Sequence, residues 1–324
     1  VSPGRNLQIK PYLLGRTVRP VAQGATFDPG SAVGLDAKLG LTPSLTLDLT
    51  AHPDFAQVEA DELTVNLTQF STFYPEKREF FIENSGTFYV GDAARNNRVT
   101  VTPTPDEDLL LFHSRRISLS ANGTPIQTLG GARLTGRVGG TELGALTMQV
   151  DATSATPSTN YTVLRAKRNL RPGSDVGAIF MNRESSEPGD FNRVVGADVN
   201  LRFFGNTDWS SYLVKTASPG VSSGQYAVRT SIKQSKVVEV RYDRFLAIGD
   251  GFRDDIGYYR RTGVRKWFLD TGVRPRSASW SRRGIREWHP HVVWNIYTDL
   301  TGEVIGRRLH NGSSFFFNSG AFLE

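Results

Sequence analysis

The stretch NRVVGADVNLRFF, residues 192–204, alternates apolar and polar side chains with a period of two. The apolar set is Val195, Ala197, Val199, Leu201 and Phe203, and the other set is Gly196, Asp198, Asn200 and Arg202. Successive side chains of a β-strand point to opposite faces, so the pattern predicts a strand with one apolar and one polar face. Its length is that of a tilted membrane strand, about 9–11 residues, whereas strands of soluble domains are mostly shorter.

Turns and loops between such runs follow the order typical of membrane barrels. The same alternation recurs in residues 225–233 and 237–245. Tight turns are expected at residues 42–44, 139–140 and 171–174, and longer polar loops at residues 184–190 and 218–224. Outer-membrane barrels carry short turns at one end and long loops at the other. The sequence therefore predicts an all-β fold, an antiparallel transmembrane β-barrel, with residues 1–324 as a single barrel domain.

Aromatic residues gather near the ends of these runs. They are Trp209, Tyr212, Tyr258, Tyr259, Trp267, Trp280, Trp288 and Trp294. Membrane barrels place Tyr and Trp in girdles at the two lipid–water interfaces. We expect these residues to contribute to such girdles.

Composition narrows the class of protein. The chain has no cysteine, which excludes disulfides and cysteine-based metal sites. No run approaches the roughly 18 consecutive apolar residues that indicate a membrane helix. The net charge of +6 comes mainly from arginines that alternate with apolar residues in strand-like runs, instead of forming a basic tail. We therefore expect contacts to outer-membrane lipid and lipopolysaccharide phosphate, with other surface or periplasmic proteins as further partners, and no nucleic acid.

One segment, residues 54–83, breaks the alternation. It is rich in carboxylates and phenylalanines and has a proline in its middle. We predict an irregular, plug-like insert, built from short helical turns, that lies in or across the barrel mouth. Its acidic residues and nearby basic residues predict a charge network of Asp54, Glu59, Asp61, Glu62, Glu76, Lys77, Arg78, Arg115 and Arg116. A calcium site at the carboxylates is the alternative, because hard cations take oxygen ligands; no other cofactor is expected.

The same segment carries a family resemblance. The matching motifs are residues 53–61 (PDFAQVEAD), 66–81 (NLTQFSTFYPEKREFF), 111–118 (LFHSRRIS) and 130–136 (GGARLTG). In this order they resemble an uncharacterised bacterial outer-membrane β-barrel family, usually found behind an N-terminal domain like carbohydrate-binding module family 9. Glu79 and Ser118 depart from the family pattern, which has proline and glycine there. The resemblance implies a carbohydrate-binding-like domain before this chain and further strands after Glu324.

No catalytic motif emerges from the sequence. Glycoside hydrolysis needs two opposed carboxylates, and nothing selects a pair among Glu59, Glu76 and Glu83. His289 and His291 share one face of a strand, but no acidic third metal ligand is evident in the sequence, so a metal site stays undecided. Ser114 beside His113 does not make a triad. We therefore predict a protein without enzymatic activity.

The resulting functional prediction is a porin-like protein of the bacterial outer membrane, a pore or transport component linked to glycan or nutrient handling. A non-transporting surface scaffold that anchors partner proteins is the alternative. A soluble periplasmic glycan hydrolase is a weaker one. Arginines that face the lumen would either favour anions or pair with neighbouring acids, and the sequence leaves both open.

Overall fold

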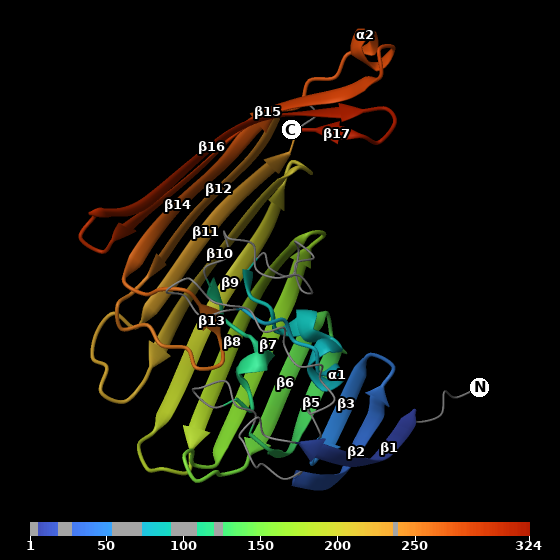
Figure 1. Cartoon of the computed structure of the whole chain (residues 1–324), viewed down its shortest axis with the longest axis vertical. Helices are drawn as coiled ribbons and strands as arrows, with labels where there is room; N and C mark the ends of the chain where they lie inside the picture. Colours follow the sequence, from blue (N-terminus) through green and yellow to red (C-terminus); the bar gives the residue numbers. More distant parts are fainter. Residues whose placement is uncertain (1–5, 19–27, 54–72, 92–108, 120–125, 236–238) are drawn as a thin grey trace.

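A computed structural model describes residues 6–18, 28–53, 73–91, 109–119, 126–235 and 239–324. Its main feature is one 15-stranded antiparallel sheet in which the strands follow one another in chain order (Figure 1). The strands are β1 (Leu7–Val18), β2 (Asp28–Thr42), β3 (Leu45–Ala51), β5 (Thr128–Val138), β6 (Thr141–Val150), β7 (Thr159–Arg171), β8 (Ser174–Ser185), β9 (Phe191–Phe203), β10 (Thr207–Ala217), β11 (Tyr226–Ser235), β12 (Glu239–Ile248), β14 (Val264–Val273), β15 (Ile285–Asp299), β16 (Val304–Phe317) and β17 (Phe322–Leu323). This meander confirms the prediction of an all-β antiparallel fold of the transmembrane-barrel class.

Short turns and longer connections alternate along the meander as far as β14; the 11-residue connection after β14 and the four-residue connection after β15 depart from this order. Residues 43–44, 139–140 and 172–173 make the tight turns expected from the sequence. The connections at the opposite end are longer, and those after β8 and β10 coincide with the predicted polar loops. Among the described residues, no helix is both long and apolar enough to span a bilayer.

The two faces of β9 show how side chains are sorted. Asp198 and Asn200 point inward and are buried, whereas Val195 points outward and is 57% exposed. The neighbouring strands repeat this arrangement: Leu164 and Leu213 are exposed, while Arg165 and Ser210 are buried. The covered inner face therefore holds polar and charged side chains together with an apolar core that includes Val163, Ile179 and Val214, while further apolar side chains stand bare on the outer face.

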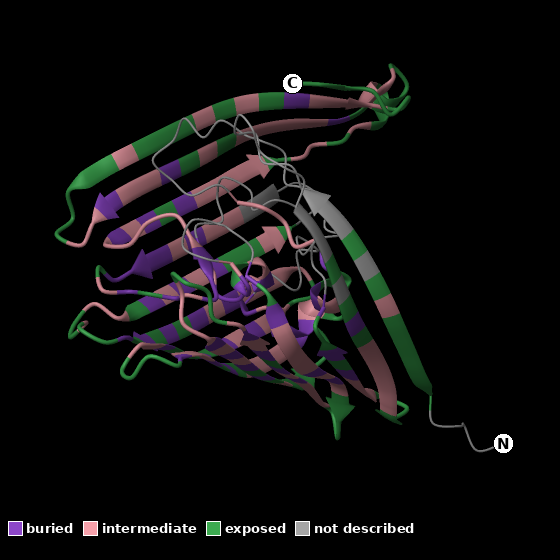
Figure 2. Cartoon of the chain, turned by 60° about the horizontal axis from the view of Figure 1, so that its bottom comes forward, coloured by how far each residue is buried: buried purple, intermediate pink, exposed green. Residues whose placement is uncertain are grey.

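The covered side is the concave inner side of the curved sheet. The described residues 73–91 and 109–119, which come between β3 and β5 in the sequence, lie outside the main sheet, and we call them the insert. They hold α1 (Glu79–Ile82), η1 (Ser85–Phe88), β4 (Leu109–Leu110) and η3 (Ser114–Arg116). These elements lie within the concavity (Figures 1 and 2). Of the predicted insert, residues 54–83, only residues 73–83 are among the described residues; these are irregular and lie within the concavity, as predicted.

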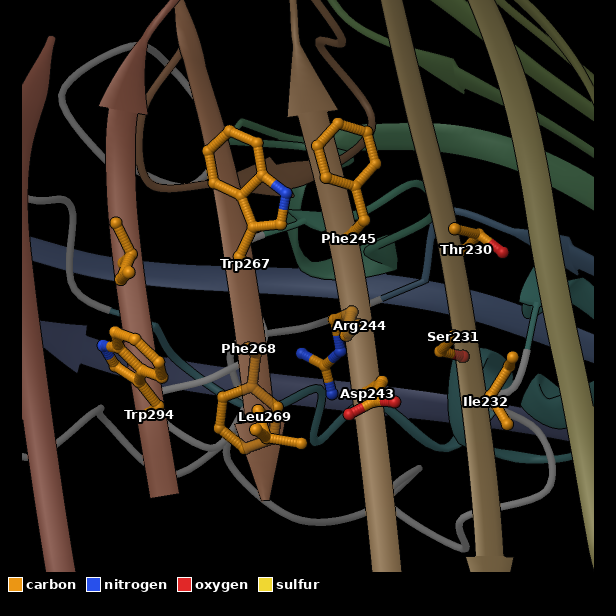
Figure 3. Close-up of a pocket in the computed structure, with 11 residues that line it drawn as sticks. Thr230, Ser231, Ile232, Asp243, Arg244, Phe245, Trp267, Phe268, Leu269 and Trp294 are labelled. Carbon is orange, nitrogen blue, oxygen red and sulfur yellow. The ribbon is translucent and has the colours of Figure 1, made fainter. Parts of the chain in front are cut away.

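The outer side carries an aromatic groove of about 610 Å³ across β11–β15. Phe245 and Trp267 lie side by side in it with ring centroids 5.3 Å apart, and Trp294 and Ile232 flank them (Figure 3). Trp267 and Trp294 therefore face outward, as expected of membrane-interface aromatics. For Tyr212 the girdle prediction is wrong, because the tyrosine side chain points inward and is 5% exposed.

A second correction concerns Tyr258 and Tyr259. They form β13 (Tyr258–Tyr259), which pairs with β4 of the insert and not with the main sheet. Tyr258 is 3% exposed. For these two tyrosines the girdle prediction is therefore wrong, because this part of the chain lies in the interior beside the insert.

Candidate functional site

Many of the buried polar contacts among the described residues lie in the interior, where the insert meets the sheet. Ala51 of β3 pairs with Gly130 of β5, so the insert emerges between two hydrogen-bonded strands and folds back over their inner face. Residues 249–263, which connect β12 to β14, contact the insert in this interior, because their strand β13 pairs with β4 of the insert. We call the inward face of the sheet the inner wall.

The first anchor is an arginine on β5 that holds the helical turn α1. Arg133 donates to Asp48 of β3 through Nε and Nη2, at 3.1 and 2.8 Å. Its remaining nitrogen, Nη1, donates to the carbonyl oxygens of Phe80 and Glu83. The last carbonyls of a helical turn lack partners within the helix. Arg133 supplies these partners from the wall and so fixes where α1 ends.

Around this anchor, surface lysines add charge pairs. Lys38 on β2 lies 2.5 Å from the carboxylate of Glu83 and 3.6 Å from that of Asp48. Lys10 on β1 lies 3.3 Å from Glu79, but both side chains are largely exposed. Exposed pairs contribute little, about 0–1 kcal/mol. Arg133, which Asp48 holds in place, therefore contributes more to the position of α1 than the exposed Lys10–Glu79 pair does.

The second anchor is an ion pair that bridges three strands. Arg165 of β7 donates from Nη1 and Nη2 to the two carboxylate oxygens of Asp198 of β9, at 2.6 and 2.9 Å. Gly177 of β8 lies between them, and a Cβ there would be 2.4 Å from Arg165 Nη1. Both charged side chains are at most 1% exposed. The missing side chain at residue 177 is thus what lets the pair meet.

This pair also holds the insert. Arg165 Nη2 donates to the carbonyl oxygen of Tyr89 at 3.1 Å, and Asp198 accepts the backbone N–H of Gly91 at 3.0 Å. A buried charge is tolerated when its remaining donors and acceptors are satisfied. Here the backbone of the insert partners one further donor of Arg165 and one acceptor of Asp198, so wall and insert stabilise each other.

An apolar seat lies beside the second anchor. Phe88 of η1 is 2% exposed and packs over β6 at Gly144, where a Cβ would lie 2.9 Å from the Phe88 ring. The ring also contacts Phe112, with centroids 5.2 Å apart. Fully burying a phenylalanine stabilises by roughly 1.5–3 kcal/mol. The insert is therefore packed against the wall as a protein core is, and not merely tethered.

A third anchor fixes residues 249–263. Asn192 of β9 donates to the carbonyl oxygen of Arg253 at 2.8 Å and accepts the backbone N–H of Asp255 at 3.0 Å. Arg183 of β8 pairs with Asp255 at 2.8 Å. Burial raises the pKa of Asp254 well above its usual range, and the backbone N–H of Ile256, which donates to its carboxylate, opposes that rise only in part.

Of the charge network predicted from sequence, the structure brings Glu76 and Arg78 together. Arg78 donates to both carboxylate oxygens of Glu76, at 2.8 and 2.7 Å, and to the carbonyl oxygens of Ile117 and Ser114. Ser114 Oγ donates to Glu76 at 2.7 Å. Burial alone would raise the pKa of Glu76, but the hydrogen bonds and charge of Arg78 outweigh it and the pKa is lowered. These contacts tie the two described parts of the insert together.

The other described members of the predicted network make other contacts. Lys77 contributes its backbone N–H to Glu76 at 3.0 Å. Arg115 and Arg116 lie in η3, and Arg116 Nε donates to the carbonyl oxygen of Gly257 at 3.3 Å. Asp54, Glu59, Asp61 and Glu62 lie outside the described residues, and so does the calcium alternative that rests on them.

His113 sits between aromatic rings at the junction of the insert with residues 249–263. Its ring stacks on Phe73 with centroids 4.8 Å apart, and Tyr258 approaches edge-on at 6.1 Å. Burial lowers the pKa of His113 to about 4, and the charge of Glu76 opposes that fall. The imidazole is therefore neutral at physiological pH.

Sequence reasoning did not single out the wall residues of these anchors. Arg133 and Arg165 occupy inward positions of strands whose side chains alternate between apolar and polar. Asp198 lies on the polar face of residues 192–204. The available signal was a charged residue flanked by apolar neighbours within a strand. Which of these charges would pair is decided by register, and register is a property of the folded sheet.

Comparisons with known proteins give one family. Residues 3–183, more than half of the chain, match the family model described as a domain of unknown function, DUF5916. No curated protein matches the chain. Similar solved structures include a porin variant from Rh. blastica (TM-score 0.37, 10% identity, 95% of this chain and 89% of that chain covered) and two Pseudomonas aeruginosa proteins. These are OccK11 (OpdR; 0.40, 11%, 96% and 75%) and OccK5 (OpdH; 0.38, 11%, 97% and 78%).

Proposed function

The chain belongs to the DUF5916 family, and from this premise we propose that it forms the wall of an outer-membrane pore whose passage is controlled by its own insert. The observation that carries the proposal is the set of apolar side chains that stand exposed on the outer face of the sheet. Leu213 and Val195 are bare on the outer face, while Asp198 and Arg165 are buried on the inner one. Exposed apolar side chains on several neighbouring strands are favourable in a lipid bilayer and unfavourable in water.

The anchors support a control element more than a permanently open channel. Arg133 and Arg165 hold backbone carbonyls of the insert, and the Phe88 ring fills a space beside Gly144. Such contacts keep the insert seated. We propose that passage requires the insert to leave these anchors, at least locally.

The cargo that we propose is a glycan or another nutrient, because of the carbohydrate-binding-like domain implied by the family resemblance. The proposal assigns no catalytic step and no cofactor to the chain. Its partners are outer-membrane lipid and lipopolysaccharide. Among the described arginines, Arg78, Arg133 and Arg165 each pair with an acid, so we expect only a weak preference for anions.

Conductance in planar lipid bilayers tests the proposal. The purified chain should insert and give small or rare openings, because the insert is seated. The double variant Arg133→Ala/Arg165→Ala should give larger or more frequent openings. A bilayer that stays sealed with both proteins, although heat-modifiable gel mobility shows both to be folded, would contradict a pore and favour the scaffold that anchors partner proteins.

The soluble hydrolase makes the opposite physical prediction. A soluble chain would stay monodisperse without detergent and would show no heat-modifiable mobility. Glu76 and Glu83 are each engaged by a basic side chain, Arg78 and Lys38. Arg78 also lowers the pKa of Glu76, whereas the general acid of glycoside hydrolysis requires a raised pKa.

A further inference from the structure

Two histidines and one glutamate meet on β15, β16 and the residue after β17. His291 Nε2 and His310 Nε2 lie 3.1 Å apart, and His310 Nε2 lies 3.6 Å from Glu324 Oε1. One ligand atom from each residue lies within 4.8 Å of the other two. Trp294 and Ile296 line the outer groove, so His291, three residues from Trp294, faces the inner side of the sheet.

We propose that His291, His310 and Glu324 bind a divalent ion of the zinc class on the inner wall. Two imidazole nitrogens bound to one tetrahedral zinc at about 2.0–2.1 Å would be about 3.3 Å apart. The distance between the two Nε2 atoms is close to that value. A set of two histidines and one carboxylate also leaves a fourth position for water or for another ligand. The inference is independent of the proposed passage through the barrel.

The second ring nitrogen of His291 supports this assignment. Nδ1 of His291 lies 3.3 Å from the carbonyl oxygen of His289. A carbonyl only accepts, so Nδ1 carries the proton and Nε2 keeps its lone pair. Metal-binding histidines are oriented in this way, by a carbonyl or carboxylate on the nitrogen that does not bind metal. The His289 ring stacks on His291 at 4.8 Å and holds its plane.

Glycines make the room that this arrangement needs. Gly272 of β14 and Gly312 of β16 both stand opposite His291 in the strand register. A Cβ at Gly312 would lie 2.8 Å from His310 Nε2 and 2.9 Å from His291 Nε2. The space between the two ligand nitrogens would thus be filled by any larger residue. Glu287 is already engaged by Arg276, and among the described residues Glu324 is the acid whose carboxylate oxygen groups with the two histidine nitrogens.

The alternative is a chain of hydrogen bonds with no metal, in which His310 links His291 to Glu324. Zinc titration of the whole chain in detergent, produced without a histidine tag, separates the two. We expect one Zn²⁺ per chain, measured by competition with a chromogenic chelator. His291→Ala and His310→Ala should each lower the affinity at least tenfold, and Glu324→Gln should lower it severalfold.

Three controls complete the experiment. His52→Asn removes an exposed histidine outside the site and should leave zinc binding unchanged. Gly312→Val keeps all three ligands but fills the space between them, and it should abolish binding while heat-modifiable mobility stays normal. Ca²⁺ should not displace Zn²⁺, because the histidines favour a softer ion. The proposal is overturned if the wild-type chain takes up no stoichiometric Zn²⁺, or if any of the three ligand variants binds it as the wild type does.

Discussion

Arg165 of β7 and Asp198 of β9 form a two-pronged ion pair across β8, the strand that separates them. Gly177 stands opposite Asp198 in the register of β8 and β9, and its missing side chain is the gap through which the pair closes. The pair then uses its spare donor and acceptor on Tyr89 and Gly91 of the insert. Sheet register, a glycine and a charge pair thus act together to seat a segment distant in sequence.

Gly177→Ala should loosen the insert. The added Cβ would lie 2.4 Å from Arg165 Nη1 and 2.6 Å from Asp198 Oδ1, so both side chains must move from their present positions. We expect a loss of about 3 kcal/mol, at the lower end of the cost of breaking a buried ion pair. Limited proteolysis should cut within residues 73–119 far faster than in the wild type. Gly306→Ala, on β16 with nothing within 4 Å, is the matched control; equal protease resistance of the two variants would refute the role of Gly177.

Replacing the ion pair by apolar residues should separate barrel stability from insert seating. Arg165→Met leaves Asp198 buried without its cation and should cost about 3–5 kcal/mol. Adding Asp198→Leu removes the stranded charge, so the urea midpoint of unfolding should recover most of that loss. The contacts to Tyr89 and Gly91 stay lost, so the insert should remain protease-sensitive. Recovery of both properties would mean that the anchor does not hold the insert.

The alternation of residues 192–204 was enough to predict strands, their length and the antiparallel class, because a period of two is a local property of the chain. The tight turns at Pro43 and at Gly139 followed from turn chemistry for the same reason. The anchors could not be predicted in this way. Arg165 and Asp198 are partners only through the register of two intervening strand pairs, and Tyr89 joins them from an insert without periodicity.

Because strand register cannot be derived from local sequence, the girdle prediction was wrong for two tyrosines and the partners of His291 were not predicted. Tyr212 and Tyr258 have the sequence context of girdle residues, but both are buried. The side chain of Tyr212 points to the inner face of β10, and Tyr258 lies in β13, which pairs with the insert. His291 shared a strand face with His289, as expected, while its partners His310 and Glu324 came from elsewhere. An acidic ligand far along the chain cannot be recognised before strand pairing is known. For the charge network, only the part around Glu76 and Arg78 lies among the described residues.

Acidification should release the junction between the insert and residues 249–263. Burial lowers the pKa of His113 to about 4, below its ordinary value of 6.5. Between these values the unfolded state binds more protons than the folded one, so stability is lost as pH falls from 6.5 towards 4. The full loss is on the order of 3 kcal/mol. Protease sensitivity of residues 109–119 measured from pH 7.5 to pH 4 should rise in this window, and His113→Phe should flatten the profile.

Asp254 should act in the opposite direction. Burial raises its pKa well above 3.8, so the folded state holds a proton that the unfolded state has lost. Its contribution to stability is present at low pH and declines as pH rises through the folded pKa. Asp254→Asn keeps an acceptor for the backbone N–H of Ile256 and cannot ionise. We expect this variant to raise the urea midpoint at pH 8 and to leave it almost unchanged at pH 4; a lower midpoint at pH 8 would refute a protonated Asp254.

The outer face provides the most direct test of the membrane premise. Leu213 is 60% exposed on β10, and the residues opposite it are Ala197 and Val228. Leu213→Arg would place a charge in lipid, at a cost of about 2–4 kcal/mol near the middle of a bilayer and less near its surfaces. Folding into lipid vesicles, followed by gel mobility, should therefore be strongly reduced. Ser222→Arg adds the same charge to an exposed loop residue and should fold like the wild type. If both variants fold into vesicles equally well, Leu213 does not face lipid and the barrel assignment fails.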